Sequence, residues 1–238
     1  MIVNKKKAVW ITGASSGIGK ALSIEFARNG LLVLGTARRI DLLEQVKVEL
    51  DEFVNNFVAV QLDISDYTSV DQFYKNVFQN YWVDCLINNA GITSFKPALD
   101  DSIEEVRRIV EVNLLGSIYS IKSVLPEMIE RKSGTIINIL SVVTQKVFTA
   151  SSAYSASKSG LHAYAKVLRE EVRDKNIRVI NVLPGATATP IWHTAVLQKY
   201  SERMMSADKI AELIYKFYSE KSNLVSEEVV IRPIKGDL

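Results

Sequence analysis

Short apolar runs alternate with amphipathic stretches along the whole chain. The apolar runs have the length and β-branched content of buried strands, and the stretches between them repeat apolar residues with helical spacing. The predicted strands are residues 8–12, 31–37, 58–62, 83–88, 135–140, 178–183 and 228–232. The predicted helices are residues 17–29, 41–52, 69–80, 103–131, 152–174 and 207–219.

Strands without a polar face, each followed by a helix, predict a parallel sheet that helices cover on both faces. Right-handed crossovers then give an α/β, doubly wound, Rossmann-like fold of about seven strands. No repeat or linker interrupts the pattern, so we expect residues 1–238 to form one domain. The least regular stretch, residues 184–206, is too long for an ordinary connection and is predicted to be a substrate-binding loop or lid.

Composition narrows the classes of function. The formal net charge of +2 does not favour a nucleic-acid partner, and the basic run Lys5–Lys7 is interpreted as a solvated lead-in to the first strand. We expect no membrane partner, because no apolar stretch is long enough to cross a bilayer. Cys85 is the only cysteine, which excludes a disulfide within the chain and favours a reducing compartment, the cytoplasm. The two histidines, His162 and His193, form no metal-ligand pattern, so no metal is predicted.

A glycine-rich turn, Thr12–Gly19 (TGASSGIG), joins the first predicted strand to the first helix. Its glycines allow a sharp turn and a close approach to a pyrophosphate, and the free N–H groups of the helix start favour an anion. The alternative is a glycine-rich turn with no ligand, which the placement between strand and helix disfavours. The residues of this loop expected to bind a dinucleotide are Gly13, Ser15, Ser16, Gly17, Ile18 and Gly19.

Other motifs follow in order along the predicted elements. They are Asn88–Gly91 (NNAG) after the fourth strand, Asn113 in the long helix, Ser141 after the fifth strand, Tyr154–Lys158 (YSASK) in the next helix and Pro184-Gly185 after the sixth strand. With the TGxxxGIG turn, these motifs resemble the short-chain dehydrogenase/reductase family, in its compact single-domain branch. The resemblance covers nearly the whole chain and implies an oxidoreductase that binds a nicotinamide dinucleotide.

The residues themselves suggest the chemistry. Reduction of a carbonyl needs a proton on oxygen as hydride reaches carbon, and an unperturbed tyrosine, with a pKa of about 10, is a weak acid–base group near neutral pH. Tyr154 and Lys158 stand one helical turn apart, so the ammonium is expected to lower the pKa of the phenol. Ser141 follows a strand at the edge where ligands bind in open α/β sheets, and is expected to donate to the substrate oxygen.

The resemblance implies matching roles. Tyr154 would be the general acid/base, Lys158 would assist it and bind the nicotinamide ribose, and Ser141 would polarise the carbonyl. Asn113 would hold a water that links Lys158 to solvent. A Tyr-x-x-x-Lys pattern alone is usually ordinary surface sequence, so this prediction depends on the position of Ser141 and on the intact glycine turn.

The end of the second strand predicts which dinucleotide binds. An acidic residue there would bind the adenosine ribose and repel a 2′-phosphate. Ala37 stands where NAD-preferring relatives carry that acid, and Arg38 and Arg39 follow it. Because a guanidinium pairs well with phosphate, we predict NADP(H) rather than NAD(H). The alternative is that both arginines only begin the next helix in solvent.

The resemblance also implies the remaining cofactor contacts. Asp63 and the Ile64 backbone are expected at the adenine. Capping of the helix that follows is an alternative role for Asp63, and the two roles are not exclusive. Relatives usually carry Val or Ile at the position of Thr187, a mild departure because that contact is through the backbone. Further contacts to the ribose, phosphates and nicotinamide are expected from Asn89, Ala90, Gly91, Pro184, Gly185, Thr187 and Thr189.

Apolar residues near the inferred mouth favour a hydrophobic small-molecule carbonyl or alcohol as substrate. The residues are Ile92, Phe95, Val143, Phe148, Ile191, Trp192, Tyr200, Met204 and Met205. His193 lies in the irregular stretch, and a contact with substrate is left open. The leading hypothesis is an NADPH-dependent carbonyl reductase.

Two alternatives remain. The first is a 3-oxoacyl-[acyl-carrier-protein] reductase, although such relatives often end in a Gly-Gly segment and this chain ends in IRPIKGDL. The second is a non-catalytic NADP(H)-binding sensor, which would have no need of the Tyr154–Lys158 pair. By resemblance, the helices at 103–131 and 152–174 form a dimer contact, often within a homotetramer.

Overall fold

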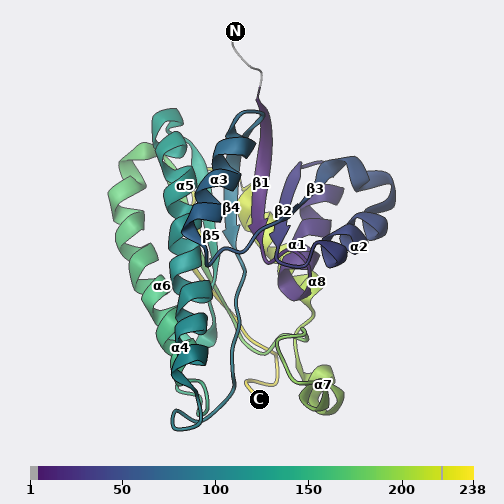
Figure 1. Ribbon diagram of the computed structural model, residues 1–238, viewed down its shortest axis with the longest axis vertical. Coiled ribbons are helices and arrows are strands. Elements are labelled where there is room, and N and C mark those ends of the chain that lie inside the picture. Colours follow the sequence, from purple (N-terminus) through teal and green to yellow (C-terminus); the bar gives the residue numbers. More distant parts are fainter. Residues whose placement is uncertain (1–4, 221) are drawn as a thin grey trace.

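The computed structural model describes residues 5–220 and 222–238 and contains one sheet of seven parallel strands. Figure 1 shows the sheet between two groups of helices. The strands are β1 Lys6–Thr12, β2 Val33–Ala37, β3 Phe57–Gln61, β4 Tyr81–Asn88, β5 Gly134–Ile139, β6 Ile177–Pro184 and β7 Glu228–Ile231. The helices are α1 Gly17–Arg28, α2 Ile40–Leu50, α3 Tyr67–Phe78, α4 Ile103–Val110, α5 Gly116–Arg131, α6 Ser152–Val172, α7 Thr194–Tyr200 and α8 Ala207–Ser219.

The strand order is β3-β2-β1-β4-β5-β6-β7, so the chain reverses its direction of winding between β1 and β4. All pairings are parallel, which confirms the doubly wound, Rossmann-like fold. In open sheets of this kind, ligands bind outside the carboxyl ends of the strands at such a switch point. The fold therefore directs attention to the loops after β1 and β4.

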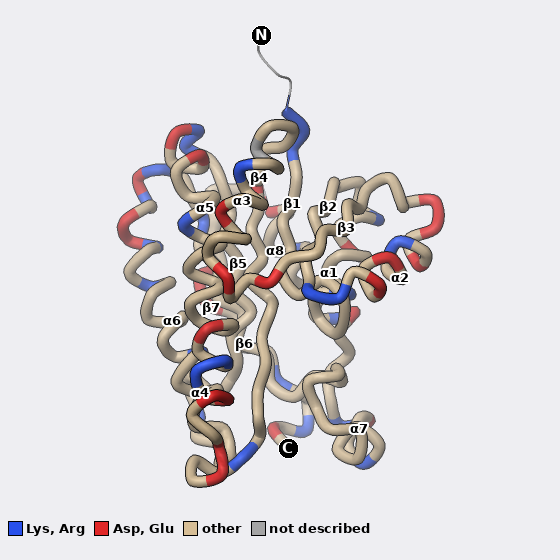
Figure 2. Tube along the Cα trace, viewed as in Figure 1, with Lys and Arg blue, Asp and Glu red and all other residues tan. Residues whose placement is uncertain are grey.

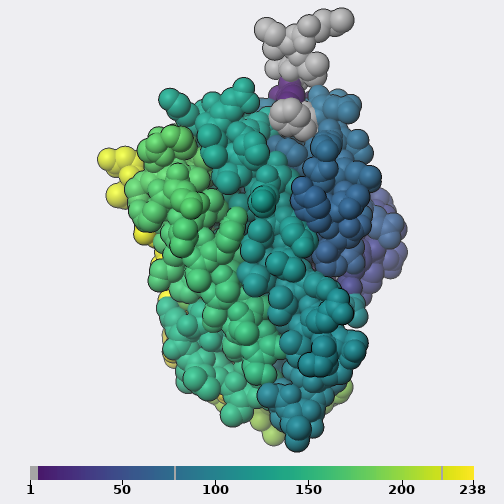
Figure 3. Space-filling view, turned by 60° about the vertical axis from the view of Figure 1, so that its left-hand side comes forward, coloured from purple at the N-terminus to yellow at the C-terminus, as the bar shows by residue number. Residues whose placement is uncertain are grey.

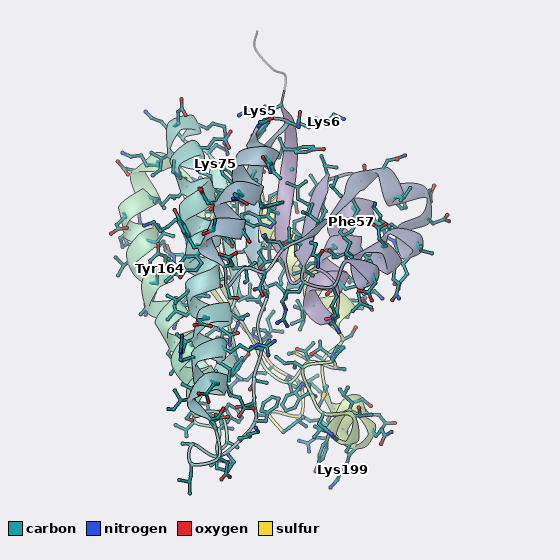
Figure 4. The ribbon with its side chains drawn as sticks, in the orientation of Figure 1. Lys5, Lys6, Phe57, Lys75, Tyr164 and Lys199 are labelled. Atoms are coloured by element: carbon teal, nitrogen blue, oxygen red, sulfur yellow. The ribbon has the colours of Figure 1, made fainter. Side chains whose placement is uncertain are left out.

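Alternate residues of each strand enter two separate cores. Val9 and Ile11 of β1 face α1, α2 and α8, whereas Trp10 faces α3, α5 and α6. The period of two along a strand accounts for this split, and it explains why the strands read as continuous apolar runs. Phe57, labelled in Figure 4, places its ring where a side chain at Gly35 of β2 would stand.

Charged residues lie mainly on the outer helices, as Figure 2 shows along α2, α4 and α6. Figure 3 shows α3, α5 and α6 packed side by side on one face of the molecule. In the part of the chain that the structure describes, no helix is long and apolar enough to cross a membrane.

Two predicted elements differ from the structure. The helix expected over residues 103–131 is divided into α4 and α5 by a π-helical segment, Glu111–Leu115. The stretch at 184–206, expected to be irregular, contains the short helix α7 and a parallel bridge between Thr187 and Met205. Figure 4 shows Lys199 of α7 at the lower edge of the molecule, away from the sheet.

Candidate active site

A cavity of about 720 Å³ opens at the carboxyl ends of the strands. It is within the usual size range for sites that bind a small molecule or cofactor. Among the predicted cofactor and catalytic residues, Gly19 and Asn113 do not line it, and all the others do. The sequence motifs therefore converge on one cavity although they lie far apart along the chain.

The glycine-rich turn lies at one end of this cavity. Gly13 has a φ of +67°, which favours glycine, and a Cβ there would stand 2.8 Å from the Cα of Ala90. Gly17 also has a positive φ, of +55°, and faces Thr189. Gly19 lies behind the loop, where a side chain would collide with Asn89 and with the Gly13 carbonyl. The glycines thus serve the close packing of the loop as well as access to a ligand.

Asn89 holds the glycine-rich turn against β4. Its Nδ2 donates to the carbonyl oxygens of Thr12 at 2.9 Å and of Gly13 at 3.1 Å. The Thr12 hydroxyl oxygen in turn accepts from the backbone N–H groups of Asn89 and Ala90, at 3.1 and 3.2 Å. The resemblance implied that Asn89 contacts the cofactor, but its Nδ2 already donates within the protein. The residue therefore shapes the loop in addition to lining the cavity.

The N-terminus of α1 has the features of an anion site. Ser16 is its N-cap residue, yet the Ser16 side chain makes no capping bond, and the first turn carries no acidic residue. The N–H groups of this turn and the positive end of the helix dipole are therefore available to a phosphate. Ser15, Ser16 and Ile18 line the cavity at this point.

The end of β2 carries two arginines into the cavity wall. Arg38 and Arg39 are exposed there, and neither forms an ion pair with a described residue. Ala37, beside them, is buried. A phosphate on the adenosine side would meet two guanidinium groups at this strand end. The alternative in which the arginines only begin α2 is weakened, because both line the cavity.

Asp63 lies after β3 and also faces the cavity. Its Oδ1 accepts from the backbone N–H of Ser65 at 3.0 Å and from the Ser65 hydroxyl at 2.6 Å. The alternative that Asp63 caps the next helix is wrong, because Asp66 is the N-cap residue of α3 and accepts from Thr68. Ile64 beside it is buried and packs where a side chain at Gly116 would stand.

Ser141, Tyr154 and Lys158 meet on the opposite side of the cavity. Ser141 caps the short turn after β5, and its hydroxyl shares a hydrogen bond with the Tyr154 side chain. The Nζ of Lys158 lies 5.8 Å from the centre of the Tyr154 ring and donates to the Ile139 carbonyl at 2.7 Å. The predicted helical spacing thus brings phenol and ammonium to one place.

Burial shifts the pKa values of both groups. It raises the pKa of Tyr154 to about 12, against which the hydrogen bond with Ser141 acts. It lowers the pKa of Lys158 to about 8. The expectation that the ammonium lowers the pKa of the phenol is not met in the protein alone, because desolvation is the larger effect on Tyr154. Near neutral pH the phenol is therefore protonated and able to donate, and most of Lys158 remains charged.

Asn113 lies in the π-helical segment and is fully buried. Its Oδ1 accepts from the Ile92 N–H at 2.8 Å, and its Nδ2 donates to the Ile92 carbonyl at 2.9 Å and to the Ser157 hydroxyl at 3.0 Å. The side chain thus ties the loop after β4 to α6, next to Lys158. The role implied for Asn113 in proton supply stays a prediction.

The segment after β6 closes the other side of the cavity. The Thr187 hydroxyl donates to the Gly185 carbonyl at 3.0 Å, and Thr189 lies over Gly17 of the glycine-rich turn. Trp192 donates to the Thr187 carbonyl at 3.0 Å, and its ring is stacked on Phe95 with centroids 4.8 Å apart. The stack joins the loop after β4 to the segment after β6 at the apolar side of the cavity. His193 caps α7 and does not line the cavity.

Among the lining residues that the sequence did not mark as part of the site are Thr93, Asp237 and Leu238. Thr93 lies two residues after the NNAG motif, so its position beside the site could have been predicted from that motif. Asp237 and Leu238 reach the cavity because the chain folds back after β7. A local pattern of sequence does not predict such a return.

Comparison with known proteins identifies the family. A model of the family described as short chain dehydrogenase matches residues 7–199. A sepiapterin reductase from Chlorobaculum tepidum is 33% identical over 242 residues, which cover 98% of this chain and 98% of that protein.

Solved structures give the same result. The alcohol dehydrogenase of the archaeon Thermococcus sibiricus, complexed with 5-hydroxy-NADP, is 28% identical, with a TM-score of 0.86 and coverage of 97% of both chains. A 3-oxoacyl-[acyl-carrier protein] reductase with bound NAD from Brucella melitensis is 26% identical, with a TM-score of 0.85 and coverage of 97% of this chain and 91% of that one.

Proposed function

The chain belongs to the short-chain dehydrogenase family, and from this premise we propose that it uses NADPH to reduce the carbonyl group of a small, largely apolar molecule. The observation that carries the proposal is the convergence of Ser141, Tyr154 and Lys158 on a cavity whose other end is a glycine-rich turn. The reverse reaction, oxidation of the alcohol, uses the same groups.

The residues at the cavity fit NADP(H). The uncapped start of α1 suits the pyrophosphate, and Arg38 and Arg39 suit a 2′-phosphate on the adenosine ribose. The relative from Thermococcus sibiricus was solved with an NADP derivative and the one from Brucella melitensis with NAD, so the arginines of this chain decide the assignment. When bound, the nicotinamide supplies or accepts the hydride.

The proposed roles of the side chains follow from their protonation. Ser141 donates a hydrogen bond to the substrate carbonyl and polarises it. As carbon gains the hydride, the Tyr154 hydroxyl gives its proton to the oxygen, since its pKa of about 12 keeps it protonated beforehand. The Lys158 ammonium, 5.8 Å from the ring centre, stabilises the phenolate that remains. A proton from solvent then restores the phenol.

The direct test is oxidation of NADPH, followed by absorbance, over a panel of ketones and aldehydes of increasing apolar size. We expect turnover that rises with apolar size, a clear preference for NADPH over NADH, and a large loss in Ser141→Ala. Binding of NADPH without turnover of any carbonyl in the wild type would contradict the proposal and favour the sensor alternative.

The 3-oxoacyl-[acyl-carrier-protein] reductase remains a second candidate, supported by the fold shared with the Brucella melitensis protein. Activity on 3-oxoacyl thioesters that exceeds activity on simple ketones would favour it.

We also propose a homo-oligomer that forms through the α4, α5 and α6 face, as in the family. Ile103 and Val167 on this face are 69% and 60% exposed, which supports burial against a second copy. Sedimentation that shows only a monomer would contradict this proposal. The cytoplasmic location stays a prediction from the cysteine content.

A further inference from the structure

The segment after β7 returns to the cavity and brings a carboxylate with it. Gly236 has a φ of +81° and donates its N–H to the Pro233 carbonyl at 2.8 Å, which turns the chain back. Asp237 then lines the cavity beside Gly185, the residue that follows β6. Figure 1 shows this end of the chain beneath the sheet, between α4 and α7.

The two oxygens of Asp237 differ in their surroundings. Oδ2 is paired with Lys146 at 3.0 Å and with Arg232 at 3.5 Å. Both of these cations are partly exposed, at 53% and 39% of their side chains, so this oxygen faces the solvent side. Oδ1 is buried and has no hydrogen-bond partner among the described residues. A Cβ at Gly185, which lines the cavity together with Asp237, would lie 3.5 Å from Oδ1.

The position of Asp237 is held from several sides. Its backbone carbonyl accepts from Arg203 at 3.3 Å, which connects it to the segment after α7. The Gly185 N–H donates to the Ile231 carbonyl at 2.7 Å, which fixes the end of β7 against β6. The Asp237 side chain is only 6% exposed. The carboxylate is therefore presented in a defined direction.

A buried carboxylate oxygen without a donor is unfavourable in a folded protein, and such an atom in a binding cavity marks a position where a ligand donor fits. A carboxylate accepts hydrogen bonds and does not donate them when ionised. The complementary group is thus an N–H or O–H, and a cationic donor binds most strongly. The same cavity is also lined by Phe148 and by the Phe95–Trp192 stack, which suit an apolar body.

We propose that Asp237 is a substrate-positioning residue, and that the substrate is a carbonyl compound with an apolar body and an amine or similar hydrogen-bond donor remote from the carbonyl. The proposal rests on the proposed carbonyl reduction, with Tyr154 at the carbonyl end and Asp237 at the donor end of one substrate. The other group that Asp237 could serve is the amide of the nicotinamide, since Gly185 lies on that side of the cavity. The experiment separates the two.

The test uses two ketones of equal size, 3-(aminomethyl)acetophenone and 3-ethylacetophenone. Their binding to the NADP⁺-loaded wild-type protein is measured by quenching of protein fluorescence. We expect the amine to bind about 10-fold or more tightly than its ethyl counterpart, as for a hydrogen bond to a charged group. In Asp237→Asn the amine should bind only about one to three times as tightly as the ethyl compound, while NADP⁺ binds as in the wild type.

Asp174→Asn is the matched control, because it removes the same charge from a surface ion pair with Lys175. It should keep the wild-type ratio. Equal binding of the two ketones to the wild type, or a parallel loss of the ratio in the control, overturns the proposal. Loss of NADP⁺ binding in Asp237→Asn overturns it as well, because the carboxylate then serves the cofactor.

A second variant covers the case in which Asp237→Asn does not fold. Lys146→Ala removes one cation beside the carboxylate and should raise the preference for the amine by about twofold to fivefold. An unchanged or lower preference overturns the proposal. The outcome is also separate from that of the proposed function. A binding preference without any reduction of the ketones defeats the reductase and keeps the subsite, whereas reduction of both ketones with no preference defeats the subsite alone.

Discussion

Replacement of Lys158 by methionine tests how strongly the fold penalises the buried ammonium. Lys158 is 3% exposed, and burial lowers its pKa from 10.5 to about 8. At about 1.4 kcal/mol for each pH unit, this shift corresponds to about 3 kcal/mol of native-state destabilisation at pH values where the lysine is charged in both states. Methionine fills a similar volume without the charge. It also leaves the Ile139 carbonyl without the donor that lies at 2.7 Å, which offsets part of the gain.

The pH dependence isolates the charge from the hydrogen bond. Below pH 8 the native and unfolded states of the wild type both carry the proton, and the full penalty is present. As pH rises through 8 toward 10.5, the native state releases the proton first, so the wild type becomes more stable relative to the variant. The free energy of unfolding of the wild type, minus that of Lys158→Met, should therefore rise by about 2–3 kcal/mol between pH 7 and pH 10.

Urea unfolding at several pH values gives both free energies. Lys158→Arg is the control, because its guanidinium stays charged over this range and should give no such rise relative to Lys158→Met. Free energies of unfolding for the wild type and Lys158→Met that run parallel from pH 7 to pH 10 would contradict this prediction. A parallel course would mean that the ammonium is not desolvated in the folded protein.

Three further outcomes follow from the geometry. Arg38→Leu should weaken NADPH about 10-fold and leave NADH nearly unchanged in a fluorescence titration, and equal losses for both would contradict the phosphate assignment. Gly13→Ala should lower the free energy of unfolding in urea by about 2–4 kcal/mol, because a Cβ there would lie 2.8 Å from the Cα of Ala90. Gly30→Ala, which has a φ of +79° but open space around it, should lower it by only about 1 kcal/mol. Asn138→Ala removes the centre of a buried asparagine ladder and should cost about 2–4 kcal/mol by the same measurement. A cost below that of an ordinary surface substitution would show the ladder to be dispensable.

The sequence was sufficient for the sheet because its strands are buried on both faces. Continuous apolar runs such as residues 8–11 of β1 favour a parallel sheet covered on both faces. The asparagine ladder, formed by Asn88, Asn138 and Asn181, shows what the pattern conceals: these residues pair across β4, β5 and β6 at matching register, with bonds of 2.9 and 3.0 Å. Asn88 is the first residue of the NNAG motif and the last residue of β4. Its partners depend on the order of the strands in the sheet, which the motif does not contain.

The remaining differences come from long-range packing. The π-helical segment at Glu111–Leu115 has no local sequence signal, since its apolar spacing continues that of α4. The segment contains Asn113, whose side chain accepts a hydrogen bond from the Ile92 N–H in the loop after β4. The high pKa of Tyr154 depends on burial, which the Tyr-x-x-x-Lys spacing does not encode. The return of Asp237 to the cavity depends on the turn at Gly236 and on ion pairs with residues distant in sequence.

Proton transfer from Tyr154 is tested most directly by the rate of hydride transfer from bound NADPH in Tyr154→Phe, measured in a single turnover with a ketone that the wild type reduces. Phenylalanine keeps the ring beside Lys158 and removes only the hydroxyl that gives the proton. We expect a rate lower by about 100-fold or more, with the dissociation constant of NADPH in the same sample within about twofold of the wild-type value. A variant that transfers hydride at the wild-type rate would contradict this expectation.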